Sequence, residues 1–162
     1  MAARRAPTGT PALVALAAAG IEHTALTYEH APGAGYGREA ADALGLDPDR
    51  VFKTLLAEVD GELVVAVVPV SGTLDLKAQA TALGAKKAVM APVPVAERAT
   101  GYVVGGISPL GQRTRHRTVV DESAELFDTV YVSGGRRGLD VGLAPDDLVR
   151  LTDALVADVA RG

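Results

Sequence analysis

The sequence has no cysteine and no tryptophan, and aromatic residues make up only 4% of its 162 positions. Without cysteine, the protein has no disulfides, no thiolate metal sites and no cysteine nucleophile of its own. This absence fits a reducing compartment. With so few aromatic rings, the core has to be built from Val, Leu and Ala, and the length suits one domain with a sizeable core.

Long hydrophobic runs are absent as well, so no segment is expected to cross a bilayer and no membrane partner is expected. Residues 1–20 nevertheless combine a basic start with a short apolar run, as secretory signals do. The alternative is a disordered tail over residues 1–9 followed by a helix. Thr10 is then its N-cap, Pro11 its first residue and Gly20 its end. Both ends carry residues that a helix needs, so we favour the tail and helix.

Positive charge is in short supply, because the formal net charge is −4. A broad electrostatic interaction with nucleic acid is therefore not expected, DNA is not an expected partner, and any RNA contact needs a local basic patch. Basic residues form three short clusters: Lys86-Lys87, Arg113/Arg115/Arg117 and Arg136-Arg137. Each cluster is either solvated surface or a phosphate-binding strip.

Only three histidines are present, and no two of them have the i,i+4 spacing of a helical metal site. They are His23, His30 and His116. The sequence also lacks a nucleophile elbow, a P-loop and a dinucleotide-binding motif. We therefore expect no metal and no cofactor.

The pattern of apolar residues, glycines and prolines predicts one α/β domain over residues 10–162. We expect a mixed, strongly curved, barrel-like sheet with peripheral helices. Further helices are expected at 38–45, 72–84 and 92–101, within 118–127 after a strand, and as an amphipathic terminal helix at 144–160. Strands are expected at 23–30, 51–68 (a hairpin) and 85–91, at the start of 102–112, and as a pair within 129–143.

The hairpin segment "VFKTLLAEVDGELVVAVVPV" (51–70) has a lysine near its start. Asp60-Gly61 is a strong two-residue turn signal. Because side chains alternate along a strand, Lys53 lies on the more apolar face, opposite the face that Glu58 marks as the wetter one, at least near the turn. Lys53 either extends its ammonium into water from a strand end or directs it into a pocket, where it meets a carbonyl, carboxylate or phosphate.

Three glycine-bearing loops directly follow predicted strands: "GAGYG" (33–37), "GGISPLG" (105–111) and "SGGRRG" (133–138). Glycine lets backbone N–H groups approach a ligand and form an anion-binding concavity, although any one loop taken alone is better explained as a simple turn. If the loops meet, they form the mouth of one pocket. Asp140 follows the third loop in an apolar strand, either as a strand-edge charge or as a partner for Lys53 or a ligand amine.

Several segments together resemble one protein family. They are "TPALVALAAAGIEHTALTYEH", "VFKTLLAEVDGELVVAVVPVSGTLDLKAQATALGAKKAVMA", "ERATGYVVGGISPLGQ" and "YVSGGRRGLD". From about Thr10 to Ala160, the chain resembles the YbaK family of bacterial Cys-tRNA(Pro) deacylases. That family is related to the editing (insertion) domain of bacterial prolyl-tRNA synthetase.

The resemblance implies a cytoplasmic enzyme that acts in trans on a mischarged tRNA acceptor end. It clears cysteine wrongly attached to the proline tRNA, and Cys-tRNA(Cys) is a second possible substrate. The family mechanism uses the substrate's own thiol as nucleophile, which suits a chain without cysteine; water is the alternative. Prolyl-tRNA synthetase is an expected partner. Two other functions stay open: a non-catalytic aminoacyl- or nucleotide-binding module, and an editor of another mischarged tRNA such as Ala-tRNA(Pro).

The resemblance also implies roles for residues. Lys53 orients the aminoacyl-adenosine end and stabilises charge near the ester. The loop formed by Gly105, Gly106, Ile107, Ser108 and Pro109 supplies backbone N–H donors for an oxyanion and for substrate positioning. The remaining substrate contacts are expected from Tyr28, Tyr36, Thr54, Ser133, Gly134 and Asp140, with Asp140 facing the cysteine α-amino group. The family usually has phenylalanine where this chain has Tyr36. The loop 31–37 of this chain is one residue shorter than the corresponding loop of the family.

Overall fold

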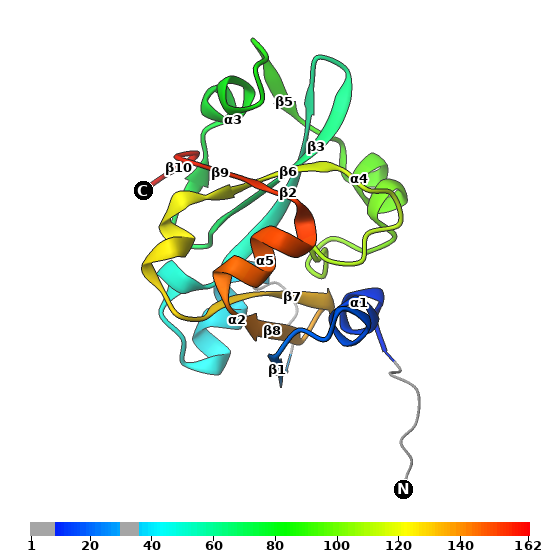
Figure 1. Ribbon diagram of the computed structural model, residues 1–162, viewed down its shortest axis with the longest axis vertical. Coiled ribbons are helices and arrows are strands. Elements are labelled where there is room, and N and C mark those ends of the chain that lie inside the picture. The colour runs from blue at the N-terminus through cyan, green and yellow to red at the C-terminus, as the bar shows by residue number, and fades with distance from the viewer. Residues whose placement is uncertain (1–8, 30–35) are drawn as a thin grey trace, which may run out of the picture.

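The computed structural model describes residues 9–29 and 36–162, with the side chains of residues 36 and 37 excepted. The elements, shown in Figure 1, are α1 (Pro11–Ala19), β1 (His23–Thr27), α2 (Tyr36–Leu44), η1 (Pro48–Arg50), β2 (Phe52–Val59), β3 (Glu62–Pro69), β4 (Thr73–Leu74), α3 (Leu76–Ala82), β5 (Ala88–Met90), α4 (Val93–Thr100), β6 (Arg117–Asp121), η2 (Glu122–Leu126), β7 (Val130–Arg136), β8 (Leu139–Leu143), α5 (Pro145–Thr152), β9 (Leu155–Ala157) and β10 (Ala160–Arg161). The predicted tail, apart from Gly9, and most of the first glycine loop lie outside the described residues.

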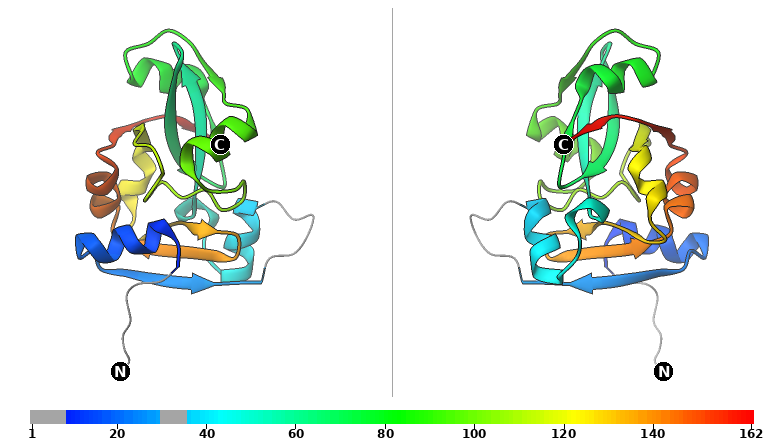
Figure 2. Two further views of the ribbon diagram at one scale, coloured as in Figure 1. Left: turned by 90° about the vertical axis from the view of Figure 1, so that its right-hand side faces the viewer. Right: turned by 90° about the vertical axis from the view of Figure 1, so that its left-hand side faces the viewer.

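The described strands form three sheets. A five-stranded mixed sheet has the order β5-β2-β3-β6-β9, and a three-stranded antiparallel sheet has the order β1-β8-β7. β10 and β4 make a small third sheet. Figure 2 shows the three-stranded sheet lying across the lower end of the molecule, with the β2–β3 hairpin rising above it. The prediction of a mixed α/β fold is confirmed.

The barrel-like sheet is a wrong prediction. Among the described residues no sheet closes on itself. The two larger sheets are linked by one isolated bridge, between Val51 and Tyr131. The five-stranded sheet ends in the short strands β5 and β9, which pair on one side only. Because closure of a barrel needs every strand to pair on both sides, these interruptions leave open edges.

The first helix begins and ends where the sequence predicted. Thr10 has an extended backbone, and its hydroxyl oxygen accepts a hydrogen bond from the Leu13 N–H at 3.2 Å. Pro11 is the first helical residue, and Gly20 ends the helix with φ of 67°, which glycine adopts without steric cost. The capping residues therefore define α1 on both sides.

The predicted hairpin is confirmed, with Asp60 and Gly61 both at positive φ in the turn between β2 and β3. The Glu58 side is the wetter one near the turn, as expected, because Glu58 is partly exposed there while Ala57 and Val59 are buried. Further from the turn the order is reversed. Thr54 is buried on the Glu58 side of β2, whereas Lys53 is only half-buried on the other side. Both faces of β2 are covered, because Leu56 belongs to one hydrophobic cluster and Ala57 to a second.

The predicted terminal helix over 144–160 is too long. α5 ends at Thr152, and Asp153 takes the left-handed conformation with φ of 53°. The apolar residues that follow form β9, which pairs in parallel with β6. Their spacing suits either a helix or a strand, and the free edge of β6 selects the strand.

Two other elements differ from their predictions. The segment 102–112 contains no strand, because irregular backbone runs from Gly101 until β6 begins at Arg117. The helix predicted for 72–84 is divided: residues 73–74 form β4, and Asp75 then N-caps α3 by accepting from the Ala78 N–H at 3.0 Å.

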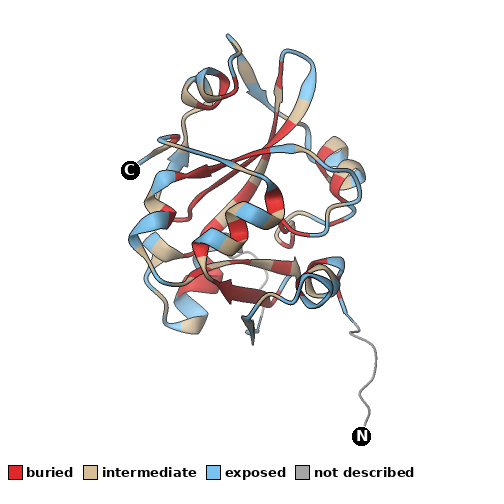
Figure 3. Ribbon diagram, viewed as in Figure 1, coloured by how far each residue is buried: buried red, intermediate tan, exposed pale blue. Residues whose placement is uncertain are grey.

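The core lies along the central strands. Figure 3 shows buried residues concentrated in β2, β3 and β8, with exposed residues on the outer turns of the helices. Small β-branched residues fill this space: Val64, Val65, Val67 and Val68 are all fully buried. The prediction of a Val, Leu and Ala core is confirmed. None of the helices among the described residues is long and apolar enough to span a bilayer.

Candidate active site

A cavity of about 330 Å³ opens beside β2 and β7. These strands touch at the Val51–Tyr131 bridge and form no further ladder beyond it. Seven of the predicted site residues line the cavity together: Tyr28, Lys53, Thr54, Gly105, Ile107, Ser133 and Asp140. They come from the segment after β1, from β2, from the loop after α4 and from the consecutive strands β7 and β8, so four distant parts of the sequence meet here.

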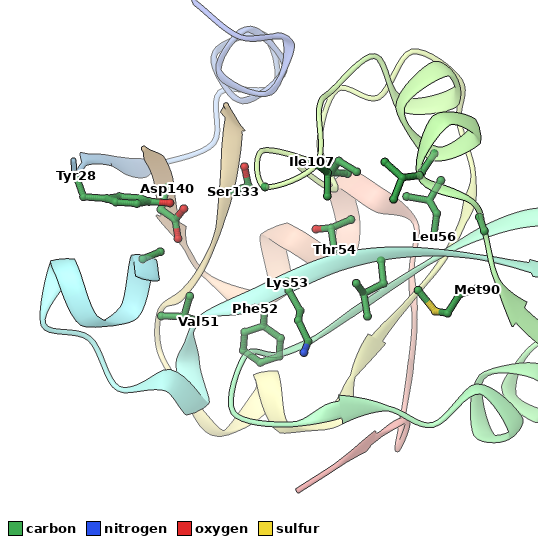
Figure 4. A pocket seen from close by; sticks show the side chains of 17 residues that line it. Tyr28, Val51, Phe52, Lys53, Thr54, Leu56, Met90, Ile107, Ser133 and Asp140 are labelled. Carbon is green, nitrogen blue, oxygen red and sulfur yellow. The ribbon is translucent and has the colours of Figure 1, made fainter. Parts of the chain in front are cut away.

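The cavity has a polar end and an apolar end. Figure 4 shows Tyr28 beside Asp140 at one end, and Leu56 and Met90 at the other, with Thr54 and Ile107 between them. The sequence did not single out the residues of the apolar end, because Leu, Met and Val in strands and helices read as ordinary core. Met90 and Val93 are exposed (47% and 50%) and border this end.

Lys53 is half-buried in the cavity wall, and burial lowers the pKa of its ammonium. Figure 4 shows Lys53 and Thr54 leaving β2 on opposite sides, as strand geometry requires. Within the described part of the chain, its ammonium forms no ion pair and no hydrogen bond. The idea that Asp140 is its partner therefore finds no support, and the lysine is left available to a ligand.

Asp140 is 5% exposed in β8 and faces the same cavity. Burial raises its pKa to about 7, and its carboxylate accepts no hydrogen bond from the described residues. Tyr28 is its neighbour: burial, and then the Asp140 carboxylate, raise the pKa of the Tyr28 hydroxyl. A cationic ligand group beside Asp140 would restore the charged form of this carboxylate.

Two hydroxyl groups complete the polar wall. The Thr54 Oγ1 is buried without a hydrogen-bond partner among the described residues, an arrangement that costs free energy unless a ligand supplies the partner. The Ser133 Oγ accepts a hydrogen bond from the Gly135 N–H at 3.1 Å. This bond orients Ser133 at the point where β7 bulges against β8.

The second and third glycine loops meet beside the cavity, as the sequence suggested. A Cβ placed on Gly106 would lie 2.7 Å from the Arg136 Cα, so only glycine permits this approach. The Arg137 Nε donates to the Val104 carbonyl oxygen at 2.8 Å. The Glu97 carboxylate accepts from the Val104 N–H at 2.8 Å. These contacts fix the loop whose residues 104, 105 and 107 line the cavity.

The main-chain donors of this loop are not equivalent. The Gly106 N–H donates to the Val103 carbonyl oxygen at 2.8 Å and is therefore already engaged. The N–H groups of Gly105 and Ile107 form no hydrogen bond with the described residues. The Ser108 N–H also forms no hydrogen bond with the described residues, but Ser108 does not line the cavity. Of the predicted oxyanion donors, Gly105 and Ile107 are therefore the two that line the cavity with an N–H still free.

The other predicted site residues either lie behind the cavity wall or have side chains outside the part of the chain that the structure describes. Gly106, Ser108, Pro109 and Gly134 are buried and do not line the cavity. Ser108 instead shapes its loop, because its hydroxyl oxygen accepts from the Leu110 N–H at 3.1 Å. Tyr36 begins α2, but its side chain is outside the described residues. Substrate contacts from these residues stay a prediction.

The arginines of the "RTRHRT" segment do not form the suggested strip. Arg117 pairs with Glu62, with 3.0 Å between the guanidinium and the carboxylate. Arg113 instead packs beside Gly101 and reaches the Arg98 carbonyl oxygen at 3.5 Å. The segment is extended only where β6 begins. Arg113 and Arg117 therefore contact different residues.

Residues 30–151 match the aminoacyl-tRNA editing domain, and this span is well over half of the chain. The chain belongs to this editing family. The match confirms the family resemblance read from the sequence.

The relatives of this editing domain include two kinds of protein. A candidate Cys-tRNA(Pro)/Cys-tRNA(Cys) deacylase, EbsC of Enterococcus faecalis, is 39% identical over 121 residues, which are 74% of this chain and 73% of EbsC. The proline–tRNA ligase of Maridesulfovibrio salexigens is 32% identical over 133 residues, 82% of this chain but 22% of the ligase. The editing domain thus occurs both as a small protein and as part of a synthetase.

Solved structures agree with this assignment. A candidate trans-editing enzyme for prolyl-tRNA synthetase superposes with a TM-score of 0.78 at 26% identity, covering 91% of this chain and 93% of that one. The editing domain described above therefore has the fold of that enzyme.

Proposed function

We propose that this protein is an aminoacyl-tRNA deacylase that acts in trans, removes cysteine from Cys-tRNA(Pro) and accepts Cys-tRNA(Cys) as a second substrate. Membership of the editing family supports the reaction class. The similarity to a small relative named for this activity supports the substrate.

One observation carries the proposal. The cavity presents a lysine and an aspartate that do not pair with each other, and burial moves both pKa values towards the neutral forms. An aminoacyl ester supplies the missing partners: its α-ammonium suits Asp140, and the charge that develops on its carbonyl oxygen suits Lys53. Each of these two groups thus gains a partner only when the ester is bound.

The size of the cavity fits one aminoacyl-adenosine end. Its volume of about 330 Å³ is at the small end of the roughly 300–1,000 Å³ typical of small-molecule sites. Apolar walls exclude water from the ester, while the free N–H groups of Gly105 and Ile107 can bind a carbonyl oxygen. Cysteine and proline are close in size, so a separate editing site is a physical necessity for the synthetase.

We assign the chemical step to the thiol of the substrate. The thiol loses its proton, its sulfur forms a bond to the ester carbonyl carbon, and the bond from that carbon to the ribose oxygen breaks. The ribose oxygen gains a proton, and the cysteinyl group leaves as a cyclic thiolactone. Lys53 and the two free N–H groups stabilise the negative charge on the carbonyl oxygen, so no nucleophile from the protein is required.

We place this reaction in the cytoplasm, where prolyl-tRNA synthetase makes the mischarged product, and we take that synthetase as a partner. This chain is similar to part of a proline–tRNA ligase, and that similarity supports the synthetase as a partner. A chain with net charge −4 lacks a broad surface for independent tRNA binding.

A substrate panel tests the proposal. Wild type and Lys53→Ala are compared on Cys-, Ala- and Ser-tRNA(Pro) under single-turnover conditions. We expect wild type to clear only the cysteinyl ester, and Lys53→Ala to lose roughly 100-fold or more in rate, which is the scale for loss of one preorganised oxyanion-stabilising group.

Each other outcome of this experiment would indicate a different mechanism or function. Similar rates on all three esters would make water the nucleophile, and a preference for Ala-tRNA(Pro) would make this an alanine editor. Binding without turnover of any ester would identify a non-catalytic binding module. Undiminished activity of a folded Lys53→Ala would remove the assigned role of the lysine.

A further inference from the structure

We infer that the first turn of α1 is a positioning device for the cavity, and that Thr10 is the residue through which it acts. This inference rests on the proposed function for its catalytic meaning. The match to the editing family begins at residue 30, so α1 lies outside the matched span.

Thr10 contacts the loop that carries Ser133. It is 8% exposed, and its hydroxyl donates to the Gly134 carbonyl oxygen while accepting from the Leu13 N–H. A Cβ on Gly135 would lie 2.8 Å from the Thr10 Cβ, so the bulge of β7 packs directly on this residue. One hydroxyl therefore both caps the helix and holds the backbone next to Ser133.

The same helical turn contacts the loop 105–111. A Cβ on Gly111, where φ is +67°, would lie 2.5 Å from the Pro11 carbonyl oxygen. The Tyr102 hydroxyl, buried at the start of this irregular segment, donates to the Leu110 carbonyl oxygen at 2.6 Å. Burial raises the pKa of Tyr102 to about 12, and a hydrogen bond from the Ala12 backbone acts in the opposite direction.

The two loops are also joined to each other, through Gly106 against Arg136 and through Arg137 to Val104. The first turn of α1 lies against both loops and completes a closed set of contacts behind the cavity. Both loops supply lining residues, Gly105 and Ile107 from one and Ser133 from the other. A shift of one loop against the other displaces donors whose positions relative to the ester must be accurate to within a fraction of an ångström.

Three variants test this inference. Thr10→Val keeps the shape of the side chain but removes both hydrogen bonds, and Thr10→Ser keeps the hydroxyl. Asp75→Ala is the control, because it removes the N-cap of α3, a helix that lines no part of the cavity, together with an ion pair to Arg161 at 3.2 Å. The readouts are Tm, the single-turnover rate on Cys-tRNA(Pro), and the hydrogen exchange of the backbone amides in residues 105–111.

We expect Thr10→Val and Asp75→Ala to lower Tm alike, by about 2–4 °C. Only Thr10→Val should slow turnover, by roughly 10- to 100-fold, and accelerate exchange in residues 105–111, with Thr10→Ser close to wild type in both. Equal activity of Thr10→Val and Asp75→Ala would overturn the inference. If wild type itself fails to clear Cys-tRNA(Pro), the proposed function is wrong. The positioning role of Thr10 is then tested by amide exchange alone, and unchanged exchange in Thr10→Val would overturn it.

Discussion

Thr54 illustrates how a single residue of the cavity balances stability against function. Its buried hydroxyl lacks a partner among the described residues, whereas that of Thr118 on β6, also buried, donates to the His116 carbonyl oxygen at 3.1 Å. An unpaired buried hydroxyl destabilises a fold. Its place in the cavity wall therefore indicates that a ligand supplies the missing partner.

Thr54→Val should therefore raise the free energy of unfolding by about 1 kcal/mol, because it removes an unsatisfied polar group and keeps the shape. The rate on Cys-tRNA(Pro) should fall. Thr118→Val is the matched control, and it should lose stability by a similar amount because it breaks a bond that exists. Denaturant unfolding of both variants measures this; a destabilised Thr54→Val would show that its hydroxyl is satisfied in the free protein.

Asp140 gives the cavity a pH dependence. Because burial raises its pKa to about 7 from an unfolded value near 3.9, the folded state holds its proton more tightly. Its contribution to stability is then highest below about pH 4 and declines as pH rises towards 7. Asp140→Asn removes this decline, so the Tm of the variant relative to wild type should increase from pH 5 to pH 8. A constant Tm difference across this range would contradict the raised pKa.

The ionisation of Asp140 should also control substrate binding. Here a rise in pH through its pKa increases affinity, whereas the same rise lowers stability. The ionised carboxylate is the form that pairs with an α-ammonium, whose own pKa is about 7.7–8.0. The affinity for a non-hydrolysable cysteinyl-adenosine analogue should therefore peak between pH 7 and 8. Asp140→Asn should remove the lower limb of this profile.

At the scale of elements, Asp121 holds the C-terminal segment against the five-stranded sheet, which also contains β2 of the cavity wall. It ends β6, and its carboxylate accepts from the backbone N–H groups of Val159 and Ala160, both at 2.9 Å, and from the N–H and hydroxyl of Ser123. Burial acts to raise the pKa of Asp121, but these four hydrogen bonds outweigh it, and its pKa is lowered.

Asp121→Ala should lower the free energy of unfolding by about 2–4 kcal/mol, because it leaves buried N–H groups without an acceptor. The contribution of this carboxylate is present above its ordinary pKa and is lost as pH falls through the lowered folded value. The difference between variant and wild type should accordingly shrink in acid. Asp158→Ala, which breaks an exposed pair with Arg161, should change stability by less than about 1 kcal/mol; equal effects of the two variants would contradict the fastening role.

The whole molecule combines a small cavity with a negative net charge. The formal net charge of −4 leaves local features to bring tRNA to the cavity. We therefore expect prolyl-tRNA synthetase to raise kcat/KM on subsaturating Cys-tRNA(Pro) by roughly tenfold or more, because docking replaces weak collision by a high effective concentration. Titration of the synthetase into the deacylation assay measures this, with cysteinyl-adenosine as a substrate that should gain nothing. An equal gain on both substrates would indicate activation rather than delivery.

Local signals predicted those parts of the fold that local interactions define. The N-cap and C-cap of α1 and the Asp60-Gly61 turn involve residues close together in the chain, and the sequence located them correctly. The terminal helix failed because the alternative partner of residues 155–157 was β6, which is distant in the sequence. The expected barrel failed for a similar reason, since closure depends on pairing between strands that the chain does not connect directly.

By itself, the amino-acid sequence determined the family, the hairpin that carries Lys53 and the glycines that allow close backbone approach, because motif and turn chemistry depend on residue identity at short spacing. Only the tertiary structure decided which residues share one wall. It left Lys53 and Asp140 unpaired in one cavity, engaged the Gly106 N–H with Val103, left the N–H groups of Gly105 and Ile107 free, and placed Thr10 behind two loops. These relations depend on packing between distant segments, and no local pattern records where such segments meet.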